Sequence, residues 1–410
     1  MSFFISYIIN LILLSGLGYV GYRGFSESKI KHHYWPALIV KITFGIALGI
    51  MYYSFYGSGD TIYYYDQAAR LSELGIQDFL LAIFEDIPND RPDRAIYYIR
   101  IAAVIKFFTG ADYWMLSAYF SLFSFYGTFY LADKLVFSNS ELKLPSIVAW
   151  LYFPSIVFWS SGLLKECLVF GALSLLVGYY CHFRSNQRLS IFQIFLAIVS
   201  LMIIVFLKYY IAAIFLPLLA FLILYHSDIW NRWKVSIGMY KIIYSILLLL
   251  IPAVIFQYLL SPNLAFAQLW DIMLVNHNQL VQLNAEGAIH TLNWFGGYLD
   301  VLINVPYLWF SGVFRPVLGE SWSFPMVMSC LENTFILVLA LLATFYSIKS
   351  KVKWSIEAIV IILYVGFLSV LLAFSSPNFG TLARFKIYFV PYLILLIIYQ
   401  LQSLFYFKKN

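Results

Sequence analysis

Long apolar runs separated by polar interruptions dominate this chain. The runs are about 17 to 27 residues long, close to the 17 to 25 residues that a helix needs to cross the hydrocarbon layer of a bilayer. Hydrophobic residues make up 62% of the 410 residues and charged residues only 11%, which is too little polar surface for a water-soluble globule of this size. The alternation typical of outer-membrane strands is missing, so the pattern predicts an all-α polytopic membrane protein.

We expect the runs to form about 11 transmembrane helices. In chain order they cover residues 3–22, 36–56, 113–132, 145–161, 166–183, 190–207, 210–226, 240–260, 321–347, 354–374 and 387–405. The first run has no Lys or Arg before it and no small-residue cleavage pattern after it, so we expect a retained span rather than a signal peptide. Residues 1–410 are therefore expected to form a single integral membrane domain.

Lysine and arginine fall mainly in alternate loops. The loop at 23–31 and those on the same side carry 15 of the 26 cations, whereas the other side carries ten cations and fourteen acids. Because cytoplasmic loops are enriched in Lys and Arg, we expect the N-terminus outside and the C-terminus in the cytoplasm, in a bacterial plasma membrane. The net charge of +6 then reflects this asymmetry and does not indicate a nucleic-acid partner.

Two interruptions, 57–112 and 261–320, are much longer than a connection between neighbouring helices requires. Both are extracytoplasmic on this assignment, and long loops on a rigid scaffold commonly carry function. In the first, "DTIYYYDQAARLSELG" and "RAIYYIRIAAVIKFFTG" predict amphipathic helices at the membrane surface, joined by the loop "EDIPNDRPDR". In the second, "LDVLINVPYLWFSGVFRPVLGE" predicts a proline-broken, re-entrant or interfacial segment. Together we expect them to enclose a cavity at the outer surface.

Several cations depart from the positive-inside bias and lie on the outer side, each at the end of a span beside aromatic residues: Lys165, Lys208, Arg315 and Arg384. A lipid phosphate or diphosphate suits both the bidentate guanidinium of Arg and the point charge of Lys. The alternative is that each side chain only snorkels to the lipid headgroups. Glu332 falls inside a predicted span, where a carboxylate implies a partner or a function, and is expected to line the cavity.

Metal and thiol chemistry have little support in the sequence. Cys167, Cys181 and Cys330 lie within or at the ends of predicted spans without a CxxC spacing, so we expect small buried hydrophobes. His277 and His290 are thirteen residues apart in the second long interruption and are expected to be polar surface rather than metal ligands.

Four features carry a resemblance to a known superfamily. The aspartate in "SFYGSGDTIYYYDQA", the two loop helices, the hairpin "WSSGLLKE" and the late "RFKIYFVP" resemble the GT-C superfamily of membrane glycosyltransferases, and more narrowly the bacterial family 39-like enzymes that use polyprenyl-phosphate sugars. The resemblance implies a GT-C-like fold, with 3–22 as an extra N-terminal helix. It also implies that Asp60 is the catalytic base. Thr61 follows it where many members have a second acid, which leaves Asp66 as a candidate for that carboxylate.

The implied function is transfer of a sugar from a polyprenyl-phosphate donor in the membrane to a glycan, lipid or protein acceptor on the extracytoplasmic face, in cell-surface glycan or glycolipid assembly. Such a transfer needs a base for the acceptor hydroxyl, cations for the departing phosphate and a site that limits water. Direct displacement with a single base implies inversion, and no cofactor or metal is required. The predicted substrate-binding residues are Tyr63, Tyr64, Asp66, Arg91, Arg94, Lys165, Glu166, Lys208, Arg315, Glu332 and Arg384.

Other interpretations remain open at this point. Asp60 is also a good residue for a helix N-cap, and the tyrosines that follow it suit an interfacial aromatic belt. A polysaccharide repeat-unit polymerase that uses a polyprenyl-diphosphate donor would share the outer-face chemistry. A transporter or lipid flippase would also need many helices, but would be expected to show internal pseudosymmetry, which the sequence lacks.

Overall fold

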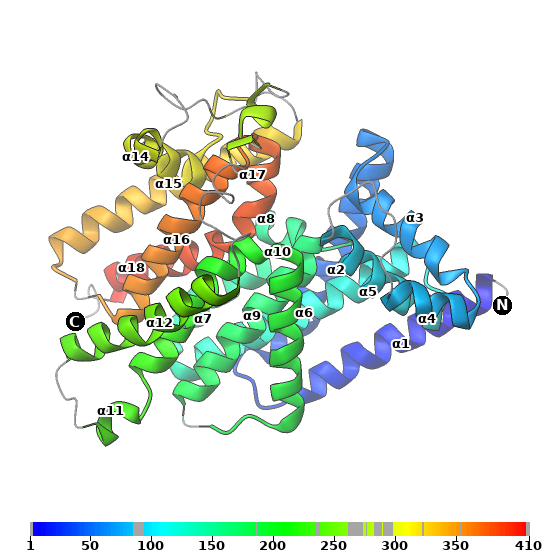
Figure 1. The fold of residues 1–410 in the computed structure, drawn as a ribbon, viewed down its shortest axis with the longest axis horizontal. Coiled ribbons are helices and arrows are strands. Elements are labelled where there is room, and N and C mark those ends of the chain that lie inside the picture. The colour runs from blue at the N-terminus through cyan, green and yellow to red at the C-terminus, as the bar shows by residue number, and fades with distance from the viewer. Residues whose placement is uncertain are drawn as a thin grey trace. The chain divides into compact units, whose positions relative to one another are not determined.

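The computed structural model describes residues 3–84, 94–185, 187–233, 238–260, 274–275, 277–282, 289, 298–321, 324–352 and 354–406. Within these ranges the regular elements are helices, which confirms the all-α class. The chain divides into two compact units, Met1–Tyr210 and Ile211–Asn410, whose helices are labelled in Figure 1. We describe each unit by itself.

The first unit holds the helices up to the first part of α10. They are α1 (Phe3–Gly24), α2 (Tyr34–Ile50), α3 (Asp60–Ser72), α4 (Ile76–Phe84), α5 (Arg94–Thr109), α6 (Tyr113–Ser138), α7 (Lys143–Ser146), α8 (Pro154–Trp159), α9 (Lys165–Arg184) and α10 (Ile191–Tyr225). Two π-helical stretches, Met51–Tyr56 and Ile147–Tyr152, continue α2 and precede α8. Helices α3 and α5 occupy the two helical segments predicted in the first long interruption, and α4 adds a third. The predicted loop between them lies outside the described residues.

The second unit holds the remaining helices. They are α11 (Ile229–Arg232), α12 (Gly238–Leu260), α14 (Tyr298–Phe314), α15 (Phe324–Lys349), α16 (Ile356–Ser375), α17 (Phe379–Phe385) and α18 (Val390–Tyr406). Within the segment predicted to be broken by proline, α14 runs as one helix through Pro306 and ends at Phe314, before Pro316. Most of the second long interruption before α14 lies outside the described residues.

Six described helices are long and apolar enough to cross a membrane. They are Phe4–Gly24, Lys31–Tyr56, Lys165–Arg184, Ile191–Tyr225, Met326–Lys349 and Ile356–Ser375, and the pair Phe379–Tyr388 and Val390–Gln402, bent by 64°, adds a seventh if it is one span. An integral membrane protein is therefore confirmed, whereas the described residues do not confirm eleven spans. The predicted span 145–161 is divided among short helical pieces, with extended backbone at Phe153 before Pro154.

Helix α10 contains a break that affects the span count. Lys208 has non-helical backbone angles, with φ −146° and ψ 60°, and it separates the helical stretches 191–207 and 209–225. The break falls between two segments predicted as separate spans. A straight helix of 35 residues would be about 50 Å long, well beyond the roughly 30 Å hydrocarbon layer.

Close packing between α6 and α9 forms the core of the first unit. A Cβ atom built at Gly127 of α6 would lie 2.2 Å from the carbonyl oxygen of Gly171 in α9, and one built at Gly171 would lie 2.8 Å from the Cα of Ser124. Small residues at such crossings let helix backbones approach closely, which is a common basis of helix association in membranes. The second unit has a similar close crossing, since a Cβ built at Gly312 of α14 would lie 2.2 Å from the backbone carbonyl oxygen of Ser369 in α16.

We expect Gly127→Ala to lower stability by about 1–3 kcal/mol, because a methyl group at this position must push the two helix backbones apart. The measurement is thermal unfolding of the purified protein in detergent. Gly16→Ala is the matched control, since a Cβ at Gly16, inside α1, would meet nothing within 4 Å. Equal melting temperatures for the two variants would contradict the proposed packing.

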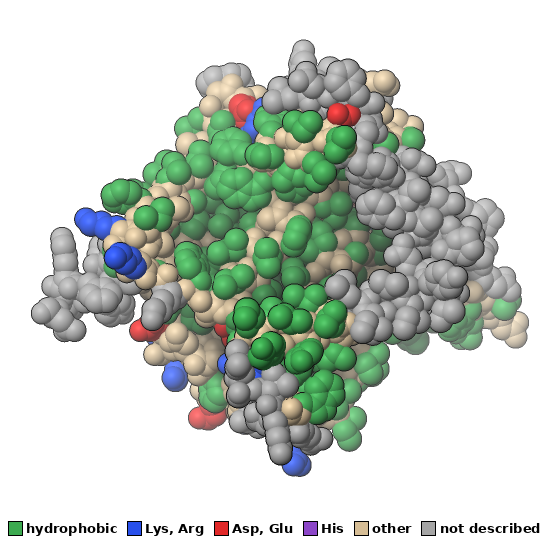
Figure 2. Space-filling view, turned by 60° about the vertical axis from the view of Figure 1, so that its left-hand side comes forward, with side chains coloured by type: hydrophobic (Ala, Val, Ile, Leu, Met, Phe, Trp, Pro, Cys, Tyr) green, Lys and Arg blue, Asp and Glu red, His purple; other side chains and the backbone are tan. Residues whose placement is uncertain are grey.

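Apolar side chains are turned outward along the candidate spans. On α15 they include Phe335, Leu341 and Phe345, with exposed fractions of 57%, 63% and 69%. Figure 2 shows hydrophobic side chains over most of the coloured surface in one view, with charged ones towards its margins. Contiguous apolar surface of this kind is expected where a protein meets lipid.

Candidate functional site

A glycine turn places Asp60 at the start of α3. Gly57 and Gly59 both have positive φ, of 66° and 141°, and a Cβ at Gly59 would lie 2.6 Å from the Tyr52 ring. Glycine is therefore needed at Gly59 for both its conformation and its space. The N-cap position of α3 is Gly59, and the partly exposed Asp60 is the first helical residue. The alternative prediction that Asp60 is the N-cap was therefore wrong.

Helix α3 is fixed on its inner face by buried groups. The Thr61 and Tyr113 hydroxyls lie 2.7 Å apart and share a hydrogen bond between α3 and the start of α6. Tyr64, one turn after Asp60, is buried, and its ring centroid lies 4.8 Å from that of Tyr98 in α5. Of the two tyrosines predicted to bind substrate, Tyr63 is half-buried beside this Tyr64 ring. The aspartate is thus carried by a well-anchored turn.

Tyr98 was not predicted as part of the site. It is fully buried, its ring centroid lies 5.2 Å from that of Phe120, and no described group forms a hydrogen bond with its hydroxyl. Burial raises the pKa of this hydroxyl well above its usual value, and the nearby Cys167, Tyr64 and Glu166 raise it further. Tyr98 therefore stays neutral and packs α5 against α3 and α6.

The turn in "WSSGLLKE" positions the first residues of α9. Gly162, with φ 75°, donates its backbone N–H to Ser121 Oγ at 2.8 Å, and the Lys41 ammonium donates to Ser160 Oγ at 2.5 Å. After this turn Lys165 begins α9, and its Nζ lies 5.0 Å from the Tyr64 ring centroid. A cation over the face of a tyrosine ring is an attractive arrangement. The hairpin "WSSGLLKE" therefore contacts the first long interruption, 57–112, through Lys165 and Tyr64.

Glu166 and Lys208 form a buried ion pair. The distance from Lys208 Nζ to Glu166 Oε1 is 2.8 Å, and the exposed fractions of the two side chains are 8% and 0%. The pair joins the first turn of α9 to the break in α10. Both residues were predicted to bind substrate, but the structure places their charged groups against each other, which points to a role in holding Lys165 in position.

We call this group the α3–α9 cluster; its members are Asp60, Tyr64, Tyr98, Lys165, Glu166 and Lys208. It joins three segments that are far apart in the sequence and were all assigned to the outer side. A further contact, 4.9 Å between the ring centroids of Tyr97 and Phe206, ties α5 to the first part of α10. Asp66 lies on the exposed side of α3. Arg91 is outside the described residues, and of Arg94 only the backbone is described, as the first residue of α5.

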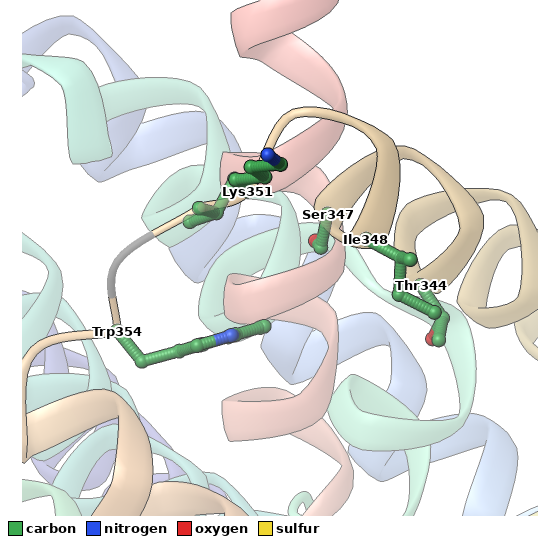
Figure 3. Close-up of a pocket in the computed structure, with 6 residues that line it drawn as sticks. Thr344, Ser347, Ile348, Lys351 and Trp354 are labelled. Carbon is green, nitrogen blue, oxygen red and sulfur yellow. The ribbon is translucent and has the colours of Figure 1, made fainter.

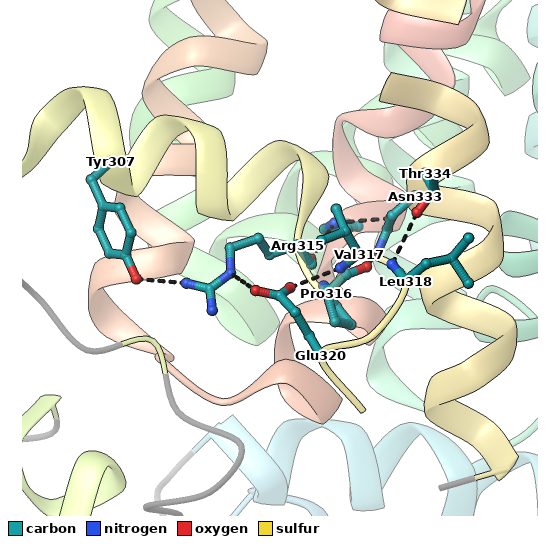
Figure 4. A network of polar contacts seen from close by, with 9 residues as sticks. Tyr307, Arg315, Pro316, Val317, Leu318, Glu320, Asn333 and Thr334 are labelled. Atoms are coloured by element: carbon teal, nitrogen blue, oxygen red, sulfur yellow. Dashed lines mark hydrogen bonds and ion pairs between the residues drawn. The ribbon is translucent and has the colours of Figure 1, made fainter. Parts of the chain in front are cut away.

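The remaining predicted residues belong to the second unit, where Arg315 is the centre of a polar network (Figure 4). Its guanidinium donates from Nε to Glu320 at 2.6 Å and from Nη1 to the Tyr307 hydroxyl at 2.6 Å. Lys386, an outer-side cation of the motif "RFKIYFVP" that was not among the predicted substrate-binding residues, donates from Nζ to the carbonyl oxygens of Val313 and Arg315, both at 2.8 Å, and to Asn333 Oδ1 at 3.0 Å. Lys386 thus links the end of α14 to Asn333 of α15, whereas the two Arg315 donors bond within the segment 307–320.

Glu332 and Arg384 are both partly exposed within the second unit. Glu332 lies on α15 next to Asn333, and the Arg384 guanidinium in α17 lies 5.5 Å from the Phe385 ring centroid. Neither position tests the predicted contact with substrate.

Two residues differ from their predicted surroundings or were missed. His277 was expected at the polar surface, but it is 2% exposed and its Nδ1 lies 2.8 Å from the Phe374 carbonyl oxygen; His290 lies outside the described residues. Lys41, which was missed, is 3% exposed within a candidate span. The sequence offered one indication of it, because Lys41 is a lone cation inside an apolar run. Cys167, Cys181 and Cys330 are buried free thiols, as expected.

Chemically, the α3–α9 cluster offers one partly exposed carboxylate that can accept a proton and one ammonium that can hold an anion. The part of the chain that the structure describes contains no group of three or more His, Cys, Asp and Glu side chains placed to hold a metal ion. The chain matches no protein-family model, no curated protein and no solved structure.

Proposed function

We propose that this chain is a membrane glycosyltransferase that moves a sugar from a polyprenyl-phosphate donor to an acceptor hydroxyl at the extracytoplasmic face. The observation that carries the proposal is the contact between Lys165 and Tyr64, which follows Asp60 by four residues on α3. Asp60 and Tyr64 are four residues apart on α3 and so lie on one face, and Lys165 Nζ lies 5.0 Å from the Tyr64 ring. A base and a cation for the leaving phosphate are thus within one site.

In the proposed reaction, the acceptor oxygen attacks the anomeric carbon while Asp60 removes its proton. The bond between the anomeric carbon and the phosphate oxygen breaks, and the polyprenyl phosphate leaves with both electrons of that bond. Lys165 stabilises the negative charge on the departing phosphate, and Asp60 then releases its proton to water. One displacement inverts the anomeric carbon. The acceptor is a glycan, a lipid or a protein.

The buried ion pair supports this role for Lys165. Glu166 follows Lys165 directly, and its bond to Lys208 fixes the first turn of α9 against the break in α10. A long lysine side chain is useful in binding a phosphate only if its backbone is held at the right place. We assign Glu166 and Lys208 as positioning residues rather than as direct ligands.

Contacts at the other end of the first unit support the proposed sidedness. Phe25, beside the cation-rich loop after α1, packs on Phe129 with ring centroids 4.8 Å apart. His33 Nδ1 lies 3.1 Å from the Tyr152 hydroxyl. These contacts join the loop assigned to the cytoplasm after α1 to the two predicted spans, 113–132 and 145–161, that flank the next loop assigned to the cytoplasm. We propose a bacterial plasma membrane, with the N-terminus outside and the C-terminus in the cytoplasm.

The test is incubation of the purified protein with a panel of polyprenyl-phosphate and polyprenyl-diphosphate sugars, with a water-soluble sugar acceptor mixture. We expect release of polyprenyl monophosphate and inversion at the anomeric carbon of the product. Turnover of diphosphate donors alone would instead indicate a repeat-unit polymerase. No release from any donor, under conditions in which the protein stays folded, would count against an enzyme.

Lys41 favours a second candidate function, transport of a sugar lipid across the membrane. An ionisable residue buried inside a candidate span is costly and commonly marks a transport path. The assay is movement of a fluorescent sugar lipid between the leaflets of liposomes that contain the protein. Transport that is lost in Lys41→Met, without release of lipid phosphate, would favour this function over the transferase.

A further inference from the structure

A shallow groove lies where α15 ends and the chain turns towards α16. It has a volume of about 410 Å³ and is lined by Thr344, Ser347, Ile348, Lys351, Val352 and Trp354. In Figure 3 the last turns of α15 form one side, the Trp354 ring extends from the other, and Lys351 lies between them. Its volume is within the range of small-ligand sites, about 300–1,000 Å³. The groove belongs to the second unit, whereas the residues proposed for catalysis belong to the first.

The backbone at Lys351 is held in an unusual conformation. Its φ is +50°. Among the described residues, Lys351 is the one residue other than glycine that has a positive φ. Val352 N–H bonds to Ser347 O at 3.1 Å and Lys351 N–H bonds to Ile348 O at 3.2 Å, so α15 ends in a Schellman motif. The residue at this left-handed position is usually glycine, and a lysine there is strained. The chain therefore carries a cation at a place where folding alone favours glycine.

The cations beside the groove are not neutralised by the described residues. Lys351 and the neighbouring Lys349 are both exposed, and neither forms an ion pair within the described ranges. The acid closest in sequence, Glu357 in the first turn of α16, is paired with His226 Nε2 at 3.0 Å. The groove is thus suited to an anion.

The groove also lies at the ends of candidate spans. The candidate span Met326–Lys349 ends two residues before Lys351, and Ile356–Ser375 begins two residues after Trp354. Lys and Trp are concentrated at the headgroup level of membranes, where the ammonium reaches phosphate and the indole ring lies between the polar and apolar layers. Ile348, with an exposed fraction of 74%, offers apolar surface next to the hydroxyls of Thr344 and Ser347.

We propose that this groove binds the headgroup of an anionic phospholipid, with Lys351 contacting the phosphate, the Thr344 hydroxyl contacting a headgroup oxygen, and Trp354 and Ile348 contacting the glycerol and upper acyl region; the Ser347 hydroxyl donates to the Ala343 carbonyl oxygen at 2.8 Å and forms part of the wall. The ligand is a membrane lipid rather than a free phosphate, because the apolar side chains of the groove have no role in binding a soluble anion.

The test is native mass spectrometry of the full chain in detergent, titrated separately with phosphatidylglycerol, phosphatidylcholine and inorganic phosphate. We expect phosphatidylglycerol to bind more tightly than phosphatidylcholine. Lys351→Gln is expected to weaken phosphatidylglycerol binding about fivefold, since a lysine near an anionic surface contributes about that factor, and to leave phosphatidylcholine binding unchanged.

Lys351→Gly shows whether weaker lipid binding comes from the missing charge or from a less stable protein. It removes the cation and the left-handed strain together, so we expect a melting temperature equal to or above that of the wild type, with lipid binding reduced as in Lys351→Gln. Lys29→Gln is the matched control, because Lys29 is an exposed loop cation with the same charge and no ion pair among the described residues. It is expected to bind lipid as the wild type does.

Unchanged phosphatidylglycerol binding in both Lys351 variants would overturn the proposal, as would an equal loss in Lys29→Gln. The lipid assignment would be overturned if inorganic phosphate bound in a way that depends on Lys351 while phosphatidylglycerol bound no more tightly than phosphatidylcholine.

Discussion

Replacing Asp60 by asparagine is expected to lower the rate of sugar transfer at least about 100-fold, because a positioned general base contributes roughly 10²–10⁴-fold to such a step. Asparagine keeps the size and one hydrogen-bonding oxygen of the side chain but cannot take up the acceptor proton. Asp60 is the first residue of α3, where a negative charge stabilises a helix by only about 0.3–1 kcal/mol. The variant should therefore fold and remain in the membrane.

The measurement is the initial rate of polyprenyl-phosphate release at saturating donor, together with thermal unfolding of each variant. Asp78→Asn is the matched control, since Asp78 is an exposed aspartate in the first turn of α4 within the same long interruption, and it should keep full activity. An active Asp60→Asn enzyme would remove Asp60 from the mechanism. A variant that binds donor as the wild type does but does not turn it over would support the assigned role.

Features that depend only on residues close by in the sequence could be predicted. The apolar runs predicted an all-α membrane protein because a helix satisfies its own backbone hydrogen bonds and needs no partner to do so in lipid. The polar dipeptide "KY" inside the run 190–226 predicted a break, and the backbone does leave the helix at Lys208. The positive φ of the glycines before Asp60 is a local feature of the same kind, because it depends on the conformational freedom of those residues alone.

Features that depend on distant residues could not be predicted. Nothing local indicates that Glu166 would pair with Lys208, which is why both were expected to face substrate. The burial of Tyr98 likewise depends on α3 and α6 lying against α5, whereas its own segment was expected at the membrane surface. The sequence thus indicated which charged residues fall in the segments assigned to the outer side, but not which charges neutralise each other.

The predicted span 145–161 is not one continuous helix, for a different reason. Its apolar content was correctly recognised, but Pro154 pushes Phe153 into an extended conformation, and Ile147–Tyr152 is π-helical. Window hydropathy measures composition and is insensitive to such breaks. The result is a run of short helices that ends in the turn before Lys165, so the irregularity is also what brings Lys165 to the α3–α9 cluster.

Breaking the buried ion pair is expected to have the largest effect on stability. Lys208→Met leaves the carboxylate of Glu166 buried at 0% exposure without its cation, and removal of one partner of such a pair costs about 3–5 kcal/mol. Glu166→Gln, which leaves Lys208 buried and charged, is expected to cost a similar amount. The measurement is unfolding by heat or denaturant in a fixed detergent. The pair of Lys134 and Asp133, 3.5 Å apart with exposed fractions of 19% and 14%, is the less buried control, and Lys134→Met should cost less than Lys208→Met.

The double variant Glu166→Leu with Lys208→Met distinguishes a structural pair from a substrate-binding one. Two apolar side chains in place of a buried pair are often neutral in stability, so the double variant should be more stable than either Lys208→Met or Glu166→Leu alone. If the pair only positions Lys165, the double variant should keep measurable transfer, with a raised KM for the donor. Loss of all activity in a double variant as stable as the wild type would mean that Glu166 or Lys208 contacts the substrate directly, and that the ion pair opens when the donor binds.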